Sequence, residues 1–363
     1  MKIRKQRDMN FELLRILAMI LIVGYHYIYH GGILDSLEEL SFNYIIIDYL
    51  RIVTRMAVGL YVLITGYYMV NSKVKIKKIF NIWTMVIFYS IAMLVASMCV
   101  RNDIGIKAVI KSIFPISSGL YWFATTYVAL YILSPFINKL IQKLSKKQYF
   151  ILITILFVLL VVIRTIFNSN WYIDGGNGES LIWFVFLYVL AGYIRLHYNK
   201  KINKLIYLLI AFIIPIFVTV LRGFALKYLG NEVERLLDYT NILNFIPMIC
   251  LFLYFREIKI KNGLFNRIIE KVAPLTFGIY LVHENLYFKP FMWKEVLGVY
   301  RYAKSPYLII HFVLVVILVF SACAIIECIR RKLFEFGKYT KLSKKVDVKL
   351  EEINDKFWKV MEE

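Results

Sequence analysis

An arginine and a histidine bracket one apolar run, Arg15-Ile-Leu-Ala-Met-Ile-Leu-Ile-Val-Gly-Tyr-His26, and this run sets the class of the whole chain. With its apolar flanks it is long enough to form a membrane-spanning helix. Eleven steps of about 100° bring a helix back to within about 20° of its starting direction. The Arg15 and His26 side chains therefore point the same way, about 16 Å apart along the axis. Ionisable side chains in a membrane are costly and usually face a polar cavity or a partner, so this helix face predicts a polar functional interior.

The rest of the chain is similarly apolar. Of its 363 residues, 60% are hydrophobic and 17% aromatic, in runs of near-spanning length, which excludes an ordinary soluble domain. The formal net charge of +21 does not indicate nucleic-acid binding, because the basic residues fall in short clusters between apolar runs. The four cysteines form neither a CxxC motif nor a Cys/His cluster, so we predict no disulfide scaffold and no zinc site of that kind.

Counting the apolar runs predicts an all-α integral membrane protein with about ten transmembrane helices. The predicted spans are residues 10–30, 53–71, 79–100, 119–140, 148–167, 181–198, 203–221, 240–256, 272–289 and 306–329. The first run follows a basic N-terminus and has no small-residue cleavage site after it. We therefore interpret it as a retained helix and not as a signal peptide.

The charges of the predicted loops alternate along these spans. One set of loops is basic, with Lys73/Lys75/Lys77/Lys78, Lys139/Lys143/Lys146/Lys147, Arg195/Lys200/Lys201/Lys204 and Arg256/Lys259/Lys261/Arg267/Lys271. The other set is acidic or mixed, with Asp35/Glu38/Glu39, Asp174/Glu179 and Glu232/Glu234/Asp238. By the positive-inside rule the basic set is cytoplasmic, and both termini are predicted to lie on that side. The chain then divides into a membrane domain, 1–329, and a basic amphipathic cytoplasmic tail, 330–363.

The first predicted helix carries a third ionisable residue, Glu12. It lies within about 40° of the face that bears His26, and it precedes Arg15 by three residues, so the two can form an ion pair. The face thus presents a carboxylate, a guanidinium and an imidazole in turn. In the alternative interpretation Glu12 and Arg15 lie at the headgroup level and snorkel, and His26 is a satisfied structural histidine.

The second predicted helix contributes two arginines, Arg51 and Arg55, four residues apart on one face. Arg55 lies about 24 Å from the predicted cytoplasmic end, close to the depth of about 22 Å expected for His26. A histidine and an arginine at one depth are candidates for a general base and an anion stabiliser. The alternative is an interfacial ion pair of Asp48 with Arg51, with Arg55 snorkelling outward.

Three further polar residues reach this layer: Arg164 in the fifth predicted span, and His283 and Glu284 in the ninth. His283 and Glu284 either line the same cavity or form a structural pair. His26 and His30 are four residues apart, a spacing that can hold zinc. No third ligand appears at a defined spacing, so no metal site is predicted.

The order and spacing of these residues resemble the membrane-bound acyltransferase family 3, whose polysaccharide O-acetyltransferases occur in bacteria. The resemblance rests on the arginine, ten residues, histidine pattern from Arg15 to His26, on Arg51/Arg55 followed by Ile64-Thr-Gly-Tyr67, and on Tyr121-Trp-Phe123 and Leu133-Ser-Pro-Phe136 together with Gly278-Ile-Tyr-Leu-Val-His283. Two features depart from the family pattern. Three residues separate Arg51 from Arg55, where the family often has two or fewer, and Thr65 replaces the usual serine.

The resemblance implies a multi-pass protein of the bacterial plasma membrane that moves an acetyl group from cytoplasmic acetyl-CoA to a hydroxyl of a cell-surface glycan or lipid-linked precursor. No permanently bound cofactor and no nucleic-acid partner is expected. In this scheme His26 is the general base, and Arg55 or Arg51 stabilises the oxyanion or orients the donor. Arg15, fixed by Glu12, holds the donor. Further substrate-binding candidates are Arg164, His283 and Glu284.

Two alternatives stay open at this point. The acyl group could pass through a covalent intermediate on His26 or a nearby tyrosine. A chain with many helices and charges at mid-depth could also be a secondary transporter or a glycan flippase. Against transport, the sequence shows no repeat symmetry and no pair of Gly/Pro-broken helices in corresponding halves.

Overall fold

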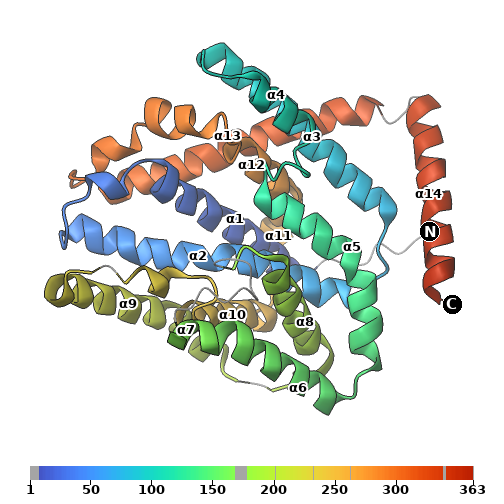
Figure 1. The fold of residues 1–363 in the computed structure, drawn as a ribbon, viewed down its shortest axis with the longest axis horizontal. Helices are drawn as coiled ribbons and strands as arrows, with labels where there is room; N and C mark the ends of the chain where they lie inside the picture. The colour runs from blue at the N-terminus through green and yellow to red at the C-terminus, as the bar shows by residue number, and fades with distance from the viewer. Residues whose placement is uncertain are drawn as a thin grey trace.

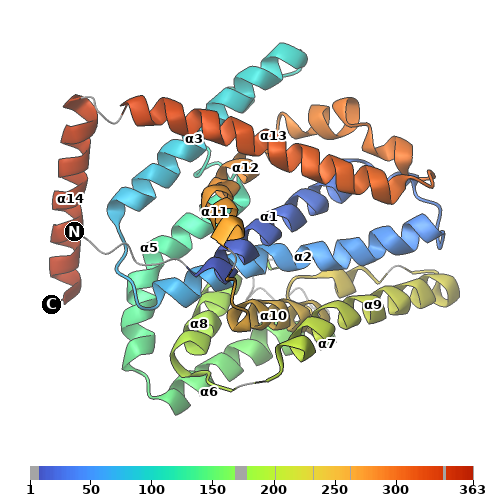
Figure 2. The same cartoon turned by 180° about the vertical axis from the view of Figure 1, so that it is seen from behind.

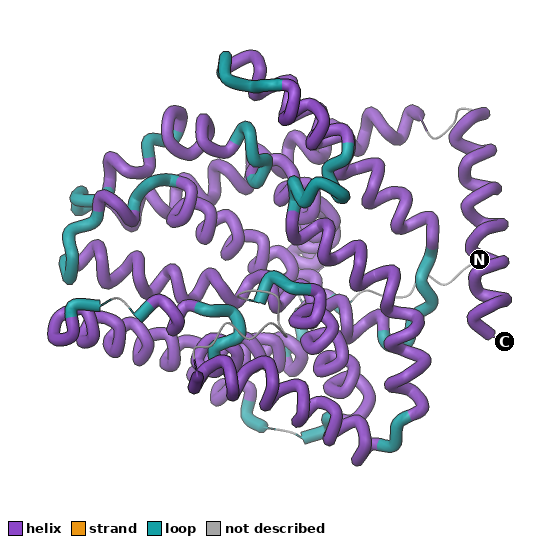
Figure 3. Tube along the Cα trace, viewed as in Figure 1, coloured by secondary structure: helices purple, strands orange, loops and turns teal. Residues whose placement is uncertain are grey.

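A computed structural model describes residues 8–167, 178–200, 202–231, 233–261, 263–337 and 341–362. These residues form helices and connecting loops, and no β-strand occurs among them, which confirms the all-α class (Figure 3). The basic residues 1–7 and the loop residues Asp174, Lys201 and Glu232, on which part of the orientation argument rests, lie outside this range.

The helices pack into a bundle (Figure 1). The helices are α1 (Met9–His30), α2 (Phe42–Met69), α3 (Ile76–Val100), α4 (Ile106–Ile113), α5 (Trp122–Lys143), α6 (Lys146–Phe157), α7 (Ile163–Phe167), α8 (Leu181–His197), α9 (Lys204–Leu229), α10 (Ile242–Glu257), α11 (Gly263–Val272), α12 (Thr276–His283), α13 (Leu308–Gly337) and α14 (Lys341–Glu362). A π-helical turn, Val158–Val162, joins α6 to α7.

Seven helical stretches in the described part of the chain are long and apolar enough to cross a membrane, by length and composition. The helix α8 is apolar but shorter. This agrees with a multi-pass protein. The count of about ten spans and the cytoplasmic placement of both termini stay predictions.

The predicted span 272–289 is wrong as a single helix. The helix α12 ends at His283, because the Asn285 side chain accepts the backbone N–H groups of Tyr287 and Phe288 and turns the chain. A separate π-helical segment, Phe291–Val296, follows. This break places Glu284 at a helix end.

Two other predictions of the spans need correction. The seventh predicted span stops at residue 221, whereas α9 continues to Leu229 and so contains Arg222. The short helix α4, between the third and fourth predicted spans, was not predicted. It is amphipathic, with Ile106, Ile110 and Ile113 exposed along one side.

The helix α2 is the centre of the bundle and packs against α1, α8, α9 and α10. It begins where the Ser41 hydroxyl accepts the backbone N–H of Tyr44. Gly66 lets α2 approach α8 closely, because a Cβ at this position would lie 2.6 Å from the carbonyl oxygen and 2.8 Å from the Cα of Tyr188. Small residues permit such close backbone contact between apolar helices.

Polar contacts tie the loops together at each end of the bundle. At one end, which we call the basic end, α1 begins and α2, α5, α8 and α10 end. The contacts there are Asn10 Nδ2 to Phe255 O (2.7 Å), Tyr68 OH to Asp8 Oδ2 (2.7 Å), Arg195 Nη1 to Tyr67 OH (3.0 Å) and Arg256 Nη2 to Tyr198 O (2.7 Å). At the opposite end, Asn43 Nδ2 donates to the carbonyls of Ala303 and Ser305, both at 2.9 Å. The basic loops predicted to share one side thus meet at one end.

We predict that Gly66→Ala destabilises the bundle by about 1–3 kcal/mol, because the added methyl group meets the backbone of α8. Thermal unfolding of the purified chain in detergent measures this. Gly223→Ala in α9 is the matched control, since its nearest neighbour would be the Leu40 side chain at 3.8 Å. Equal melting temperatures for the two variants would contradict the close α2–α8 approach.

Candidate functional site

A cavity of about 240 Å³ adjoins the C-terminal half of α1, and we call it the histidine cavity. The ionisable side chains that line it are His26, His30, Glu179, Glu284 and Lys289. Its aromatic lining residues are Tyr25, Trp122, Phe123, Tyr239 and Tyr280. Polar groups converging in an apolar, largely aromatic cavity are typical of a substrate site.

His26 and Glu284 are adjacent in this cavity. His26 is 7% exposed, and its Nδ1 lies 3.2 Å from Glu284 Oε2, although the two groups are not aligned for a hydrogen bond. Catalytic hydrogen bonds are often poorly aligned without substrate and tighten in the complex. With Nδ1 turned to the carboxylate, Nε2 is the ring nitrogen that remains for another partner.

Glu284 has two further partners, one for each carboxylate oxygen. His30 Nε2 lies 3.0 Å from Oε2, and Lys289 Nζ donates to Oε1 at 2.7 Å. Lys289 Nζ also lies 3.3 Å from His30 Nε2. The carboxylate is therefore held on both sides, as a charged group in an apolar bundle must be.

His283 packs against His26 outside the histidine cavity. Its Nδ1 donates to the carbonyl of Ile279 at 2.6 Å, and its ring centre lies 4.9 Å from that of His26. The side chain is fully buried, and its Nε2 has no hydrogen-bond partner among the described residues. His283 does not line the histidine cavity, whereas Glu284 does, and the His283 ring packs against that of His26.

The structure supplies the third potential metal ligand that the sequence did not reveal. Ligand atoms of His26, His30 and Glu284 all lie within 4.8 Å of one another. However, the Lys289 ammonium already bonds to Glu284 and lies beside His30, so it competes with a metal ion for two of these three ligands. The cluster is better described as a carboxylate shared by two imidazoles and an ammonium.

A second cavity, of about 430 Å³, lies at the basic end, and we call it the Arg15 cavity. Its charged lining residues are Asp8, Glu12, Arg15, Lys78 and Arg195. The predicted pair of Glu12 and Arg15 is confirmed, with Arg15 Nη1 donating to Glu12 Oε2 at 2.7 Å. Thr65 also lines this cavity. On α1, Glu12 and Arg15 therefore face the Arg15 cavity, whereas His26 faces the histidine cavity.

Arg55 lies behind an aromatic wall of the histidine cavity. Its Nη2 donates to the Tyr29 hydroxyl at 2.8 Å, and its guanidinium lies over the rings of Tyr25, at 5.8 Å, and Tyr239, at 5.2 Å. Tyr25 and Tyr239 line the cavity, whereas Arg55 does not. Its charge thus acts on the cavity across a layer of rings.

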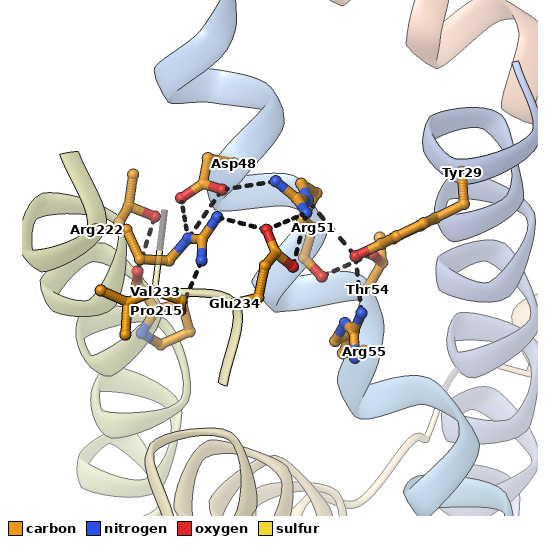
Figure 4. A network of polar contacts seen from close by, with 10 residues as sticks. Tyr29, Asp48, Arg51, Thr54, Arg55, Pro215, Arg222, Val233 and Glu234 are labelled. Atoms are coloured by element: carbon orange, nitrogen blue, oxygen red, sulfur yellow. Dashed lines mark hydrogen bonds and ion pairs between the residues drawn. The ribbon is translucent and has the colours of Figure 1, made fainter. Parts of the chain in front are cut away.

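Arg51 belongs to a buried charge network (Figure 4). Its Nη1 lies 3.3 Å from Asp48 Oδ1, and its Nη2 lies 3.2 Å from Glu234 Oε1. Arg222 is fully buried and donates from Nε to both oxygens of Asp48, at 3.1 and 3.0 Å. The pairing of Arg51 with Asp48, which the sequence offered as the alternative, is therefore present.

Arg164 is placed apart from both cavities. Its Nη2 lies 3.9 Å from Asp238 Oδ2, in the segment that precedes α10, and it lines neither cavity. The neighbouring Thr165 hydroxyl accepts the backbone N–H of Ile242. Arg164 thus helps to join α7 to the start of α10.

Sequence reasoning missed Lys289 and Arg222. Lys289 lay at the end of an expected continuous helix, and only the turn after His283 brings it back to Glu284. The available signal for Arg222 is a lone arginine directly after an apolar run. This pattern indicates the end of a helix, and the predicted span stops at residue 221, whereas α9 continues to Leu229.

Comparison with protein families matches residues 9–328 to a family model described as an acyltransferase domain, acyltransferase family 3. The match contains both cavities' charged lining residues except Asp8, and it ends before α14. Searches of curated proteins and of solved structures gave no match.

The charge network predicts a stability test by a double-mutant cycle. We expect Asp48→Asn to destabilise the protein by about 3–5 kcal/mol, because it removes the buried carboxylate from Arg222 and leaves that guanidinium with the exposed carboxylate of Glu234, 3.5 Å away. The double variant Asp48→Asn/Arg222→Met should recover part of this loss. Thermal unfolding measures both, and strictly additive losses would show that the two residues are not coupled.

Proposed function

Because the chain belongs to acyltransferase family 3, we propose that it transfers an acetyl group from acetyl-CoA to a hydroxyl of a cell-surface glycan or its lipid-linked precursor. Its apolar helices make it a multi-pass membrane protein. The observation that carries the proposal is the imidazole of His26, 3.2 Å from the Glu284 carboxylate, at the wall of an aromatic cavity. A base beside a carboxylate is what the deprotonation of a hydroxyl requires.

The proposed acetyl transfer uses His26 Nε2. This nitrogen takes the proton as the acceptor oxygen bonds to the thioester carbonyl carbon. The tetrahedral intermediate then expels the coenzyme A thiolate, which receives that proton from His26. Glu284 keeps the Nδ1 proton of His26 in place and stabilises the imidazolium that forms between these steps.

Two groups are candidates for stabilising the developing oxyanion. The Tyr280 hydroxyl is buried, lies on a residue that lines the cavity, and has no hydrogen-bond partner among the described residues. A preorganised donor of this kind is suited to an oxyanion. Arg55 adds a positive charge across the rings of Tyr25 and Tyr239 and fixes their positions. We therefore place Tyr280 in contact with the reacting oxygen and Arg55 behind it.

The donor is proposed to enter through the Arg15 cavity. Arg15, Lys78 and Arg195 line it and suit the anionic pyrophosphate of acetyl-CoA. The pantetheine arm would follow α1 from Arg15 toward His26. The acceptor would occupy the histidine cavity, so that donor and acceptor approach His26 from opposite ends of the bundle.

We predict that His26→Ala lowers the acetylation rate about 10²–10⁴-fold, the usual contribution of a general base. Glu284→Gln should lower kcat more than it raises the KM of acetyl-CoA, because it weakens the imidazolium without touching the donor. Membrane vesicles given labelled acetyl-CoA, with the label counted in extracted glycan, measure both variants.

The control for this experiment is His197→Ala. His197 packs against Tyr149 and Tyr193 at the end of α8 and lines neither cavity, so its removal should leave the rate near that of the wild type. A folded His26→Ala protein that acetylates at the normal rate would eliminate His26 both as base and as covalent carrier.

A further inference from the structure

The helix α14 lies across the basic end of the bundle, where it meets α3, the loop before α3 and the end of α5 (Figures 1 and 2). Between α14, the α2–α3 loop and the end of α5 lies a third cavity, of about 380 Å³, which we call the tail cavity. The family match ends at residue 328, so it does not account for α14 or for this cavity.

Side-chain contacts hold α14 in place along its length. The Trp358 indole N–H donates to the carbonyl of Val74 at 2.9 Å, and the backbone N–H of Ile76 donates to Asn354 Oδ1 at 3.2 Å. Near the start of α14, Asp347 pairs with Lys77 at 2.8 Å. The helix is therefore docked on the basic end at several points.

The tail cavity is rich in hydrogen-bond donors. Lys73 and Lys139 line it together with the amides Asn71, Asn138 and Gln142, and no carboxylate is among its described lining residues. The Trp358 ring forms another wall. Asn138 Nδ2 and Gln142 Nε2 already donate to the carbonyls of Met69 and Val70. The two lysines beside an indole suit a ligand that combines anionic groups with a flat ring.

In this structure the two lysines have only weakly interacting partners. Lys139 Nζ donates to the carbonyl of Met361 at 2.9 Å, and Lys73 pairs with the exposed Glu362. The Lys73 ammonium also lies 5.1 Å from the centre of the Trp358 ring. A phosphomonoester, which carries about 1.5–2 negative charges near neutral pH, is a stronger partner than a carbonyl or one exposed carboxylate.

The tail cavity adjoins the Arg15 cavity. Asn71 and Ser72, in the α2–α3 loop, line both. Gln142 Nε2 donates to the carbonyl of Val70 at 2.6 Å and so fixes the start of this loop against α5. A ligand with its charged end in the tail cavity could pass a thin arm over this loop into the Arg15 cavity.

We propose that the tail cavity binds the phosphorylated adenosine end of the acyl-CoA donor, with Trp358 stacking on the base and Lys73 and Lys139 binding phosphate oxygens; this rests on the proposed function. The geometry favours a nucleotide over an anionic lipid headgroup, because the site combines an aromatic wall with a direct boundary to the Arg15 cavity. The C-terminal helix is then part of the donor site.

The binding test uses the full chain in nanodiscs of neutral phosphatidylcholine, with adenosine 3′,5′-bisphosphate as the probe in titration calorimetry. We expect Trp358→Leu to weaken binding about tenfold or more, since an aromatic wall contributes about that much per stacked base. Lys139→Gln should weaken it several-fold and leaves the Trp358–Val74 anchor intact. Lys143→Gln is the control, because Lys143 also lies at the end of α5 but does not line the tail cavity.

A kinetic test separates this proposal from the proposed function. The ratio of the KM of acetyl-CoA to that of acetyl-pantetheine, which lacks the nucleotide, should rise about tenfold in Trp358→Leu and several-fold in Lys139→Gln, and stay unchanged in Lys143→Gln. If the wild type transfers no acetyl group but binds the bisphosphate through these residues, the proposed function fails and the nucleotide site stands. If acetyl transfer proceeds while neither variant changes bisphosphate binding or the KM ratio, the nucleotide site is overturned. Binding that responds to phosphatidylglycerol in the nanodisc and not to the bisphosphate would overturn it as well.

Discussion

A carboxylate in an apolar bundle must be paired, and the pairing of Glu284 organises the centre of this protein. His30 and Lys289 bind its two oxygens, while His26 lies 3.2 Å away without a formed hydrogen bond. Removing a charge from water costs several kcal/mol, so a carboxylate at this position is stable only with such partners. The turn that begins at Asn285 brings Lys289 back to Glu284.

Another buried carboxylate, Asp48, has a purely structural environment. Its partner Arg222 is fully buried, and the network of Figure 4 ties α2 to α9 and to the segment before α10. The charged groups of this network bond to one another and line neither the Arg15 cavity nor the histidine cavity. At Glu284, by contrast, the paired groups line open space, and one of them has an unaligned nitrogen. We therefore interpret the Asp48 network as structural and the Glu284 cluster as the candidate reactive site.

The sequence was sufficient for what depends on short spacing. The helical class, the start of α1 and the pair of Glu12 with Arg15 follow from periodicity and from residues three apart. The meeting of His26 with Glu284 joins residues far apart in the chain, so no local spacing encodes it. The break after His283 depends on the Asn285 side chain, and the aromatic wall before Arg55 depends on Tyr239 from a distant loop. The sequence predicts a basic, amphipathic and cytoplasmic tail, and no local pattern encodes its docking on the α2–α3 loop.

One unbroken helix, α1, connects the Arg15 cavity to the histidine cavity. Its backbone works as a ruler, since rise and rotation per residue are fixed together. Inserting a single residue between Arg15 and His26 would lengthen the span by only about 1.5 Å but would turn the imidazole by about 100°. The number of residues between Arg15 and His26 is therefore constrained by the direction of the two side chains, and the identities of the intervening residues can change more freely than their number.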